Sequence, residues 1–162
     1  DVFVPADMLL GKEGEGWAQA NAELAFERSG PDRYLSSFPL LAPTIDVVND
    51  SGRHDWLSAR RLGEAVADLV TLREMSLSIL GRLSAGETPA QEAALTKDLG
   101  TTFEQHLPEL VREIVGQLPV CNDAEPLSAM HAFLTQIVPT FSLRGGTREI
   151  MRGIIARGLG LR

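Results

Sequence analysis

The chain has 162 residues, 44% of them hydrophobic and 23% charged, and its formal net charge is −7. These proportions are ordinary for one soluble globular domain, and the acidic balance argues against a protein that binds nucleic-acid phosphates. The single cysteine, Cys121, excludes a disulfide within the chain.

The first 16 residues hold an apolar run at positions 2–4 and a glycine-rich stretch that ends just before Trp17. An extended apolar piece followed by glycines is typical of a passage from one structural unit to the next. We therefore expect residues 1–16 to be the end of a β-domain and a linker, and residues 17–162 to form a helical bundle domain.

The segment 17–49 has apolar residues at helical spacing but contains Pro31, Pro39 and Pro43. Proline lacks an amide donor and clashes with the preceding turn. We therefore expect the helix in this segment to bend or break at the prolines. A cluster of turn-forming residues at 49–52 ends the segment.

Three more helices are predicted where apolar residues recur at three- and four-residue steps, within 62–83, 95–114 and 127–141. Pro108 is expected to kink the second of these. The pair Gly145-Gly146 then breaks the chain before a short last helix. The pattern predicts an all-α fold, an antiparallel four-helix bundle with a short C-terminal helix.

The three histidines, His54, His106 and His131, are far apart and share no helical i,i+4 spacing, so no metal site is predicted. We find neither a signal-peptide pattern nor an unbroken apolar span of membrane length. The expected location is therefore the cytoplasm, with no membrane contact.

Three segments resemble one protein family. The entry is VFVPADMLLGKEGEGWAQANAELAFER, the third predicted helix lies in GETPAQEAALTKDLGTTFEQHLPEL, and the chain closes with GGTREIMRGIIARGLGLR. They are similar to the domain junction, the third bundle helix and the closing signature of the acyl-CoA dehydrogenases. The chain thus resembles the C-terminal helical domain of that family over nearly its whole length.

This resemblance implies that the N-terminal and middle domains of a full subunit are absent from this chain. It implies an FAD-dependent enzyme that oxidises an acyl-CoA thioester to a trans-2-enoyl-CoA, in which a carboxylate removes the α-proton. It also implies a homo- or hetero-oligomer, a dimer or tetramer, that passes electrons to an electron-transfer flavoprotein. We expect the fragment alone to be inactive.

The catalytic residues are assigned through the same resemblance. The position that commonly holds the family's catalytic glutamate is Gly145 here, and glycine cannot accept a proton. Some branches of the family carry the base on the first bundle helix, directly before an arginine, and those positions hold Glu27 and Arg28. The resemblance therefore implies Glu27 as the base and Arg28 as a residue that supports substrate binding. Taken without it, the two residues are an ordinary charged pair on a helix.

The cofactor residues implied by the resemblance are Gly146, Thr147, Glu149 and Arg53. Thr147 also stands where an N-cap is expected, so its hydroxyl should meet a free amide of the last helix. A helix N-terminus attracts phosphate groups, but the carboxylate of Glu149 would repel a pyrophosphate unless it is paired, for example with Arg152. The segment around Arg53 departs from the family's usual cofactor motif.

Two other functions stay open. The departures around Arg53, Glu113 and Gly116 are compatible with a non-catalytic partner subunit of a heteromeric acyl-CoA dehydrogenase. The chain could equally be a helical oligomerisation module without redox activity, because a fold does not by itself determine a function.

Overall fold

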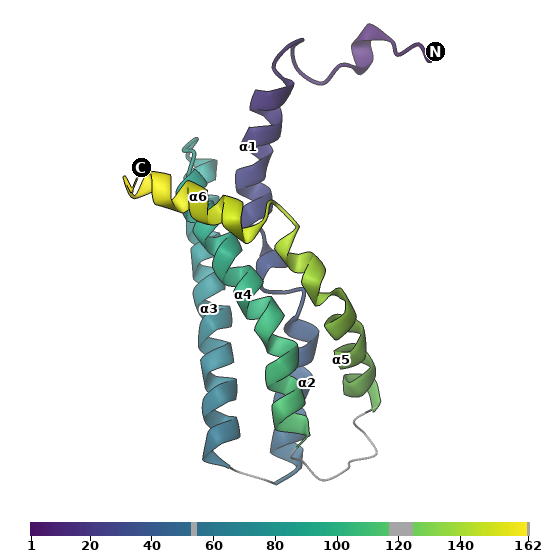
Figure 1. Cartoon of the computed structure of the whole chain (residues 1–162), viewed down its shortest axis with the longest axis vertical. Helices are drawn as coiled ribbons and strands as arrows, with labels where there is room; N and C mark the ends of the chain where they lie inside the picture. The colour runs from purple at the N-terminus through teal and green to yellow at the C-terminus, as the bar shows by residue number, and fades with distance from the viewer. Residues whose placement is uncertain (53–54, 117–124, 162) are drawn as a thin grey trace.

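A computed structural model describes residues 1–52, 55–116 and 125–161. The described part of the chain contains six α-helices and no strand (Figure 1). The helices are α1 (Gly16–Ser29), α2 (Phe38–Asp50), α3 (Trp56–Ser84), α4 (Ala90–Val115), α5 (Glu125–Ile137) and α6 (Arg148–Gly158). The predicted all-α bundle with a short last helix is confirmed.

The first predicted helix is divided into two, and the prolines explain the division only in part. Pro31 opens a 3-10 turn, η2 (Pro31–Arg33), that separates α1 from α2. Pro39 lies in the first turn of α2, where a missing amide breaks no helical bond, and α2 continues through Pro43. The break expected at Pro31 is therefore confirmed, whereas the prolines at 39 and 43 do not end the helix.

The helix α4 is the centre of the bundle, because it contacts each of the other five α-helices. Buried apolar side chains from α2 to α5 form one core with it. The core residues of α4 are Phe103, Leu107, Val111 and Ile114. Full burial of one such side chain contributes about 1.5–3 kcal/mol to stability, so this face fixes how α4 sits among its neighbours.

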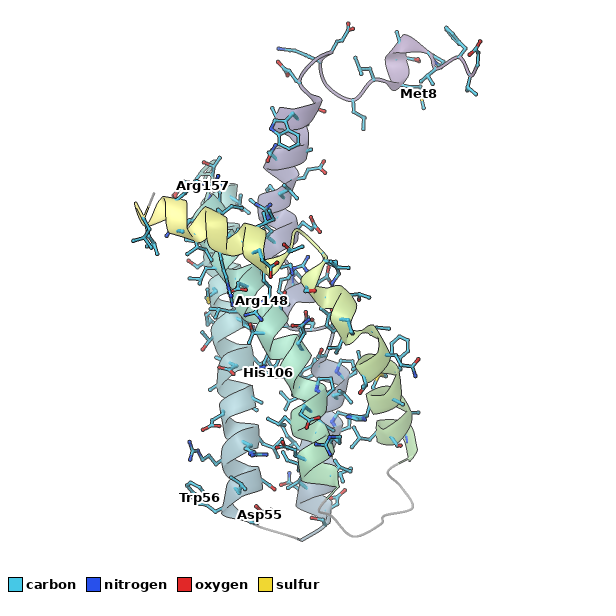
Figure 2. The ribbon with its side chains drawn as sticks, viewed as in Figure 1. Met8, Asp55, Trp56, His106, Arg148 and Arg157 are labelled. Atoms are coloured by element: carbon cyan, nitrogen blue, oxygen red, sulfur yellow. The ribbon has the colours of Figure 1, made fainter. Side chains whose placement is uncertain are left out.

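The two ends of the bundle differ. At one end, the side chain of Asp55 accepts a hydrogen bond from the amide of Ser58 over 2.8 Å and so caps the start of α3. At the opposite end, Arg148 opens α6, as Figure 2 shows. At this end, Arg28 in the last turn of α1 also contacts Gly145 in the loop that precedes α6.

Residues 1–15 extend away from the bundle and are exposed (Figure 1). They include a short 3-10 helix, η1 (Ala6–Met8), and the exposed apolar side chains of Val2 and Phe3. Within the described ranges, no helix is long and apolar enough to cross a lipid bilayer.

Candidate active site

The last turn of α1 lies against the loop that precedes α6. The Nε of Arg28 donates a hydrogen bond of 2.9 Å to the carbonyl oxygen of Gly145. A Cβ atom added to Gly145 would lie 3.4 Å from Oε1 of Glu27. The structure therefore brings together the two positions that sequence analysis names for a catalytic base, although they are far apart in the chain.

The position of Glu27 depends on how α1 ends. The turn η2 directs the chain so that Arg33 reaches back to the end of α1. Its Nε and Nη2 donate to the carbonyl oxygen of Glu27 over 3.0 and 2.8 Å, and Nη2 lies 3.8 Å from the carboxylate. The side chain of Arg33 is 2% exposed and that of Glu27 is 47% exposed. A buried anchor thus holds a carboxylate that solvent and ligands can reach.

Neighbouring helices hold the end of α1 and the turn η2 in place. The hydroxyl of Ser76 in α3 donates to the carbonyl oxygen of Ser29 over 2.6 Å. Gly100 in α4 lies so near the turn that a Cβ atom there would be 2.5 Å from the carbonyl oxygen of Arg33. Glycine at position 100 therefore permits η2 to pack directly on α4.

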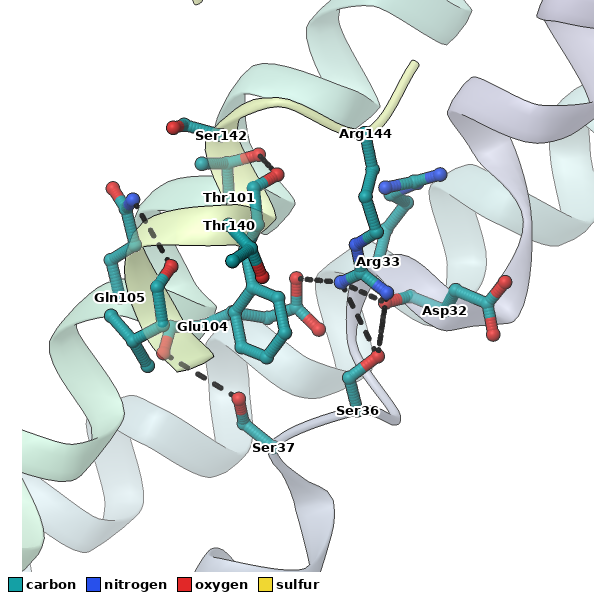
Figure 3. A network of polar contacts seen from close by, with 12 residues as sticks. Asp32, Arg33, Ser36, Ser37, Thr101, Glu104, Gln105, Thr140, Ser142 and Arg144 are labelled. Carbon is teal, nitrogen blue, oxygen red and sulfur yellow. Dashed lines mark hydrogen bonds and ion pairs between the residues drawn. The ribbon is translucent and has the colours of Figure 1, made fainter. Parts of the chain in front are cut away.

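A network of buried charges adjoins this anchor (Figure 3). The Nη2 of Arg144 donates to Glu104 over 3.2 Å, and its guanidinium also donates to the hydroxyl of Ser36 over 3.3 and 3.4 Å. Glu104 is fully buried. Burial raises the pKa of its carboxyl to about 7, against the opposing influence of Arg144, Ser36, Arg33 and Lys97.

Lys97 is also fully buried. Its Nζ donates to the hydroxyl of Thr101 over 2.6 Å and to the carbonyl oxygen of Phe141 over 2.8 Å. Burial, aided by repulsion from Arg33 and Arg144, lowers the pKa of Lys97 to about 8. The carboxyl of Glu104 is therefore under the influence of three cationic side chains, those of Arg33, Lys97 and Arg144.

The loop before α6 has the backbone that its glycines suggest. Gly145 and Gly146 have φ angles of +70° and +106°, in the left-handed region that glycine adopts at little cost. Thr147 occupies the N-cap position of α6, but its side chain makes no capping bond, so that part of the expectation is wrong. A bond from the backbone N–H of Glu149 and one from the Thr147 hydroxyl lower the pKa of the Glu149 carboxyl.

The helix α6 is held onto α4 by Asp98. The Asp98 carboxylate accepts a hydrogen bond of 2.7 Å from the Nε of Arg148 and one of 3.5 Å from the Nε of Arg152. Arg152, which the sequence offered as a partner for Glu149, is thus bonded to Asp98, and its charge also helps to lower the pKa of the Glu149 carboxyl. The predicted cofactor residue Arg53 lies outside the described residues. Glu113 forms an ion pair with Arg61 of α3.

Sequence reasoning did not single out Arg33, Glu104 or Arg144, and it gave Lys97 no role. A signal was present for two of them. Lys97 and Glu104 stand on the same face of α4 as the core residue Leu107. Charged residues on an apolar helical face are rarely buried without a partner, and they often mark a functional site.

Comparison with known proteins shows to which family the chain belongs. Residues 51–160 match the family described as acyl-CoA dehydrogenase, C-terminal domain. The chain belongs to the acyl-CoA dehydrogenase family. Two curated relatives from Mycobacterium tuberculosis (strain ATCC 25618 / H37Rv) are acyl-CoA dehydrogenase FadE29, 35% identical over 96% of this chain, and acyl-CoA dehydrogenase IpdE1, 30% identical over 99%. The chain spans 42% of the length of each.

Solved acyl-CoA dehydrogenases share the fold. The structure described as Tcur3481-Tcur3483 steroid ACAD G363A variant superposes with a TM-score of 0.81 at 22% identity, over 98% of this chain and 43% of that one. A putative acyl-CoA dehydrogenase from Mycobacterium smegmatis superposes with a TM-score of 0.77 at 20% identity, over 98% of this chain and 43% of that one. At these identities, the likeness establishes the helical architecture of the domain alone.

Proposed function

We propose that this chain is the C-terminal domain of an FAD-dependent enzyme that oxidises an acyl-CoA thioester to a trans-2-enoyl-CoA, with Glu27 as the base. The observation that carries this proposal is the position of the Glu27 carboxylate, 3.4 Å from where a Cβ of residue 145 would stand. In the family that this chain resembles, these two positions are alternative sites for the catalytic base. A carboxylate at either one can therefore approach the same region of a bound thioester.

The chemistry asked of Glu27 is removal of the α-proton. A carboxylate is a better base when water is excluded from it. Glu27 is half-exposed in this chain, so the thioester and the other domains would supply that covering. The role of Arg28 is to support the site, because its Nε already donates to Gly145 and thereby joins the two sides of the site.

The residues at the start of α6 fit contact with one edge of FAD. The Thr147 side chain makes no capping bond to α6, an 11-residue helix, so the first amides that the Glu149 carboxylate does not occupy are open to an anionic group. Gly146 and Thr147 would hold this edge, and the exposed side chain of Glu149 has room to turn from it. When bound, FAD supplies the acceptor for the β-hydride, and an electron-transfer flavoprotein would then reoxidise it.

A second candidate is a supporting subunit in a heteromeric acyl-CoA dehydrogenase. The observation that favours it is the carboxylate of Glu149, which occupies an amide at the start of α6 where an anionic cofactor would bind. The solved relative described by two joined names, Tcur3481-Tcur3483, motivates a test with partner subunits. Because that relative is described as a steroid ACAD, steroid acyl-CoA thioesters belong in the substrate panel beside straight-chain ones.

The test uses the full-length protein, alone and then mixed with candidate partner subunits. Its flavin absorbance is recorded anaerobically while acyl-CoA thioesters are added, for wild type, Glu27→Gln and Glu23→Gln. Glu23 is an exposed glutamate one turn earlier on α1 and serves as the matched control.

Bleaching in wild type and Glu23→Gln, with loss in Glu27→Gln, is the expected result. Bleaching that requires a partner and is insensitive to Glu27→Gln would assign this chain to the supporting subunit. If the protein bound neither flavin nor acyl-CoA with any partner tried, the remaining interpretation would be a helical oligomerisation module without redox activity.

A further inference from the structure

We propose that Arg33 and Glu104 are positioning residues for Glu27. Together they fix the last turn of α1 relative to the loop before α6. This inference rests on the proposed role of Glu27 as the base. Arg33 acts on the α1 side through its bonds to Glu27, and Glu104 acts on the opposite side through Arg144, the residue before Gly145.

On the α1 side, the contact is direct. Two nitrogens of Arg33 donate to the backbone carbonyl of Glu27 at 3.0 and 2.8 Å, and the guanidinium lies 3.8 Å from the Glu27 carboxylate. A guanidinium is planar and presents its donors in a fixed geometry. Because Arg33 is buried, its hydrogen bonds fix the backbone of Glu27, and its charge attracts the Glu27 carboxylate over 3.8 Å.

On the loop side, Arg144 contacts α4, the turn η2 and the segment between η2 and α2. It donates to Glu104 of α4 at 3.2 Å, to the hydroxyl of Ser36 at 3.3 Å, and to the carbonyl oxygen of Asp32 in η2 at 3.5 Å. Figure 3 shows these contacts converging on the Arg144 guanidinium. The loop that contains Gly145 is therefore tied to the same turn that carries Arg33.

The network is poorly built for stability alone. Within the described part of the chain, Arg33 Nη1, Glu104 Oε1 and Arg144 Nε are buried without a hydrogen-bond partner. Such atoms each cost about 1–3 kcal/mol, and an apolar cluster of the same volume is often as stable as buried charges. A network that carries this cost is better explained by the geometry it imposes on Glu27 and Gly145.

The network also makes the positioning depend on pH. Glu104 faces Arg33 from η2, Ser36 from the segment before α2, Lys97 from its own helix, and Arg144 from the loop. With a pKa of about 7, the Glu104 carboxyl loses its charge as the pH falls below neutrality. Arg144 then loses its anionic partner, and the loop is held less firmly.

The experiment measures the rate of flavin bleaching after rapid anaerobic mixing of the full-length protein with acyl-CoA, with its partner present if one is required. The variants are Arg33→Lys and Glu104→Gln, with Arg112→Lys as a control because Arg112 is an exposed arginine paired with Glu109. Lysine keeps the charge of Arg33 but not its paired donors. We expect Arg33→Lys to slow bleaching about 10–100-fold, as a small misplacement of a reacting group does, while the dissociation constant of acyl-CoA is unchanged.

A double-mutant cycle separates this inference from the proposed function. If Arg33 acts through Glu27, Arg33→Lys should slow a Glu27→Asp protein by less than about threefold, because the geometry is already lost. Equal effects in both backgrounds would overturn the inference, as would wild-type rates in Arg33→Lys. Wild-type bleaching in Glu27→Gln would instead overturn the assignment of the base.

Glu104→Gln supplies two further readouts. The ratio of wild-type to variant bleaching rates should be about tenfold at pH 8 and fall towards one at pH 6, since a neutral Glu104 resembles glutamine. In the substrate-free protein, hydrogen exchange should quicken in residues 27–33 and 142–147 and stay unchanged in α3. A rate ratio that is constant with pH, together with unchanged exchange in both segments, would contradict a positioning role.

Discussion

Arg28 and Gly145 are joined by a hydrogen bond of 2.9 Å, from the arginine Nε to the glycine carbonyl oxygen. This bond fixes the backbone of residue 145 beside Glu27, with the absent Cβ pointing to within 3.4 Å of the Glu27 carboxylate. A carboxylate on a side chain at position 145 would lie near that of Glu27, and two neighbouring carboxylates repel each other, so that one is forced to hold a proton. A glutamate at position 27 and a small neutral residue at 145 are therefore a consistent pair.

Transferring the carboxylate from position 27 to position 145 should transfer the role of the base with it. We expect Glu27→Gln to slow anaerobic flavin bleaching by about 10³-fold or more, and Gly145→Glu in the same protein to restore part of the rate. Recovery should be incomplete because residue 145 has a φ of +70°, and a side chain in that region costs about 1–2 kcal/mol.

The control is Gly145→Gln in the Glu27→Gln protein, which has the same strain and nearly the same shape but no base. Recovery with glutamine equal to that with glutamate would show that the proton leaves to some other group. Gly145→Glu in a protein that keeps Glu27 should be slower than wild type, because the two carboxylates crowd each other.

Two glycines of the bundle should respond to alanine in opposite ways. Gly100→Ala places a methyl 2.5 Å from the carbonyl oxygen of Arg33, so η2 must shift, and overpacking of this kind costs about 1–3 kcal/mol. Gly63 lies on the exposed face of α3 with no atom within 4 Å of an added Cβ. Gly63→Ala should therefore stabilise the protein by about 0.5–1 kcal/mol.

Thermal unfolding of both variants checks this prediction, and flavin bleaching adds a second reading. Gly100→Ala should also slow bleaching, because the turn it displaces carries Arg33. Equal unfolding temperatures for Gly100→Ala and Gly63→Ala would mean that η2 does not rest on α4 as described.

The anchor of α6 is a third test. Asp98→Asn removes the charge that holds Arg148 and Arg152, and a partly buried arginine that loses its partner costs about 1–3 kcal/mol. We expect a lower unfolding temperature and a faster release of flavin, since α6 begins at the proposed cofactor residues. Glu109→Gln breaks an exposed pair with Arg112 and should change stability by less than about 0.5 kcal/mol. If Asp98→Asn behaves like Glu109→Gln in both assays, Asp98 is not an anchor.

The helices were predictable from local chemistry, and most of the site was not. Apolar spacing located α3, α4 and α5, and the ring of Pro31 explained why α1 ends where it does. No local pattern indicates that Arg28 contacts Gly145, because that contact depends on how α1 and the loop before α6 pack at one end of the bundle. Family resemblance alone named Glu27 and Gly145 as alternative sites for the base.

The buried charges show a different limit. Lys97 and Glu104 stand on the core face of α4, so their burial could have been inferred from helical spacing. Their partners could not, because Arg144 and Arg33 come from irregular segments whose backbone no periodicity describes. The pH at which Glu104 titrates follows from those partners and from its burial, and both are properties of the packed structure.

The last prediction concerns Glu104, whose negative charge should lower the stability of the protein but support its activity. Its folded-state pKa is raised from an ordinary 4.5 to about 7, so between these values the folded protein holds a proton that the unfolded chain has released. The stability that Glu104 contributes is therefore fully present below pH 4.5 and is lost as the pH rises to 7. Glutamine at this position cannot ionise, and the stability of Glu104→Gln should lack this fall.

Unfolding temperatures of wild type and Glu104→Gln, measured from pH 5 to pH 8, check the sign. The two proteins should be nearly equal at pH 5, and the variant should become the more stable by about 1–3 kcal/mol at pH 8. The same variant should bleach its flavin more slowly at pH 8, because Arg144 no longer has an anionic partner. A variant that is both more stable and slower would mean that the charge of Glu104 is retained for the geometry of the site; one that is less stable at pH 8 would mean that the ion pair with Arg144 outweighs the cost of burying the carboxylate.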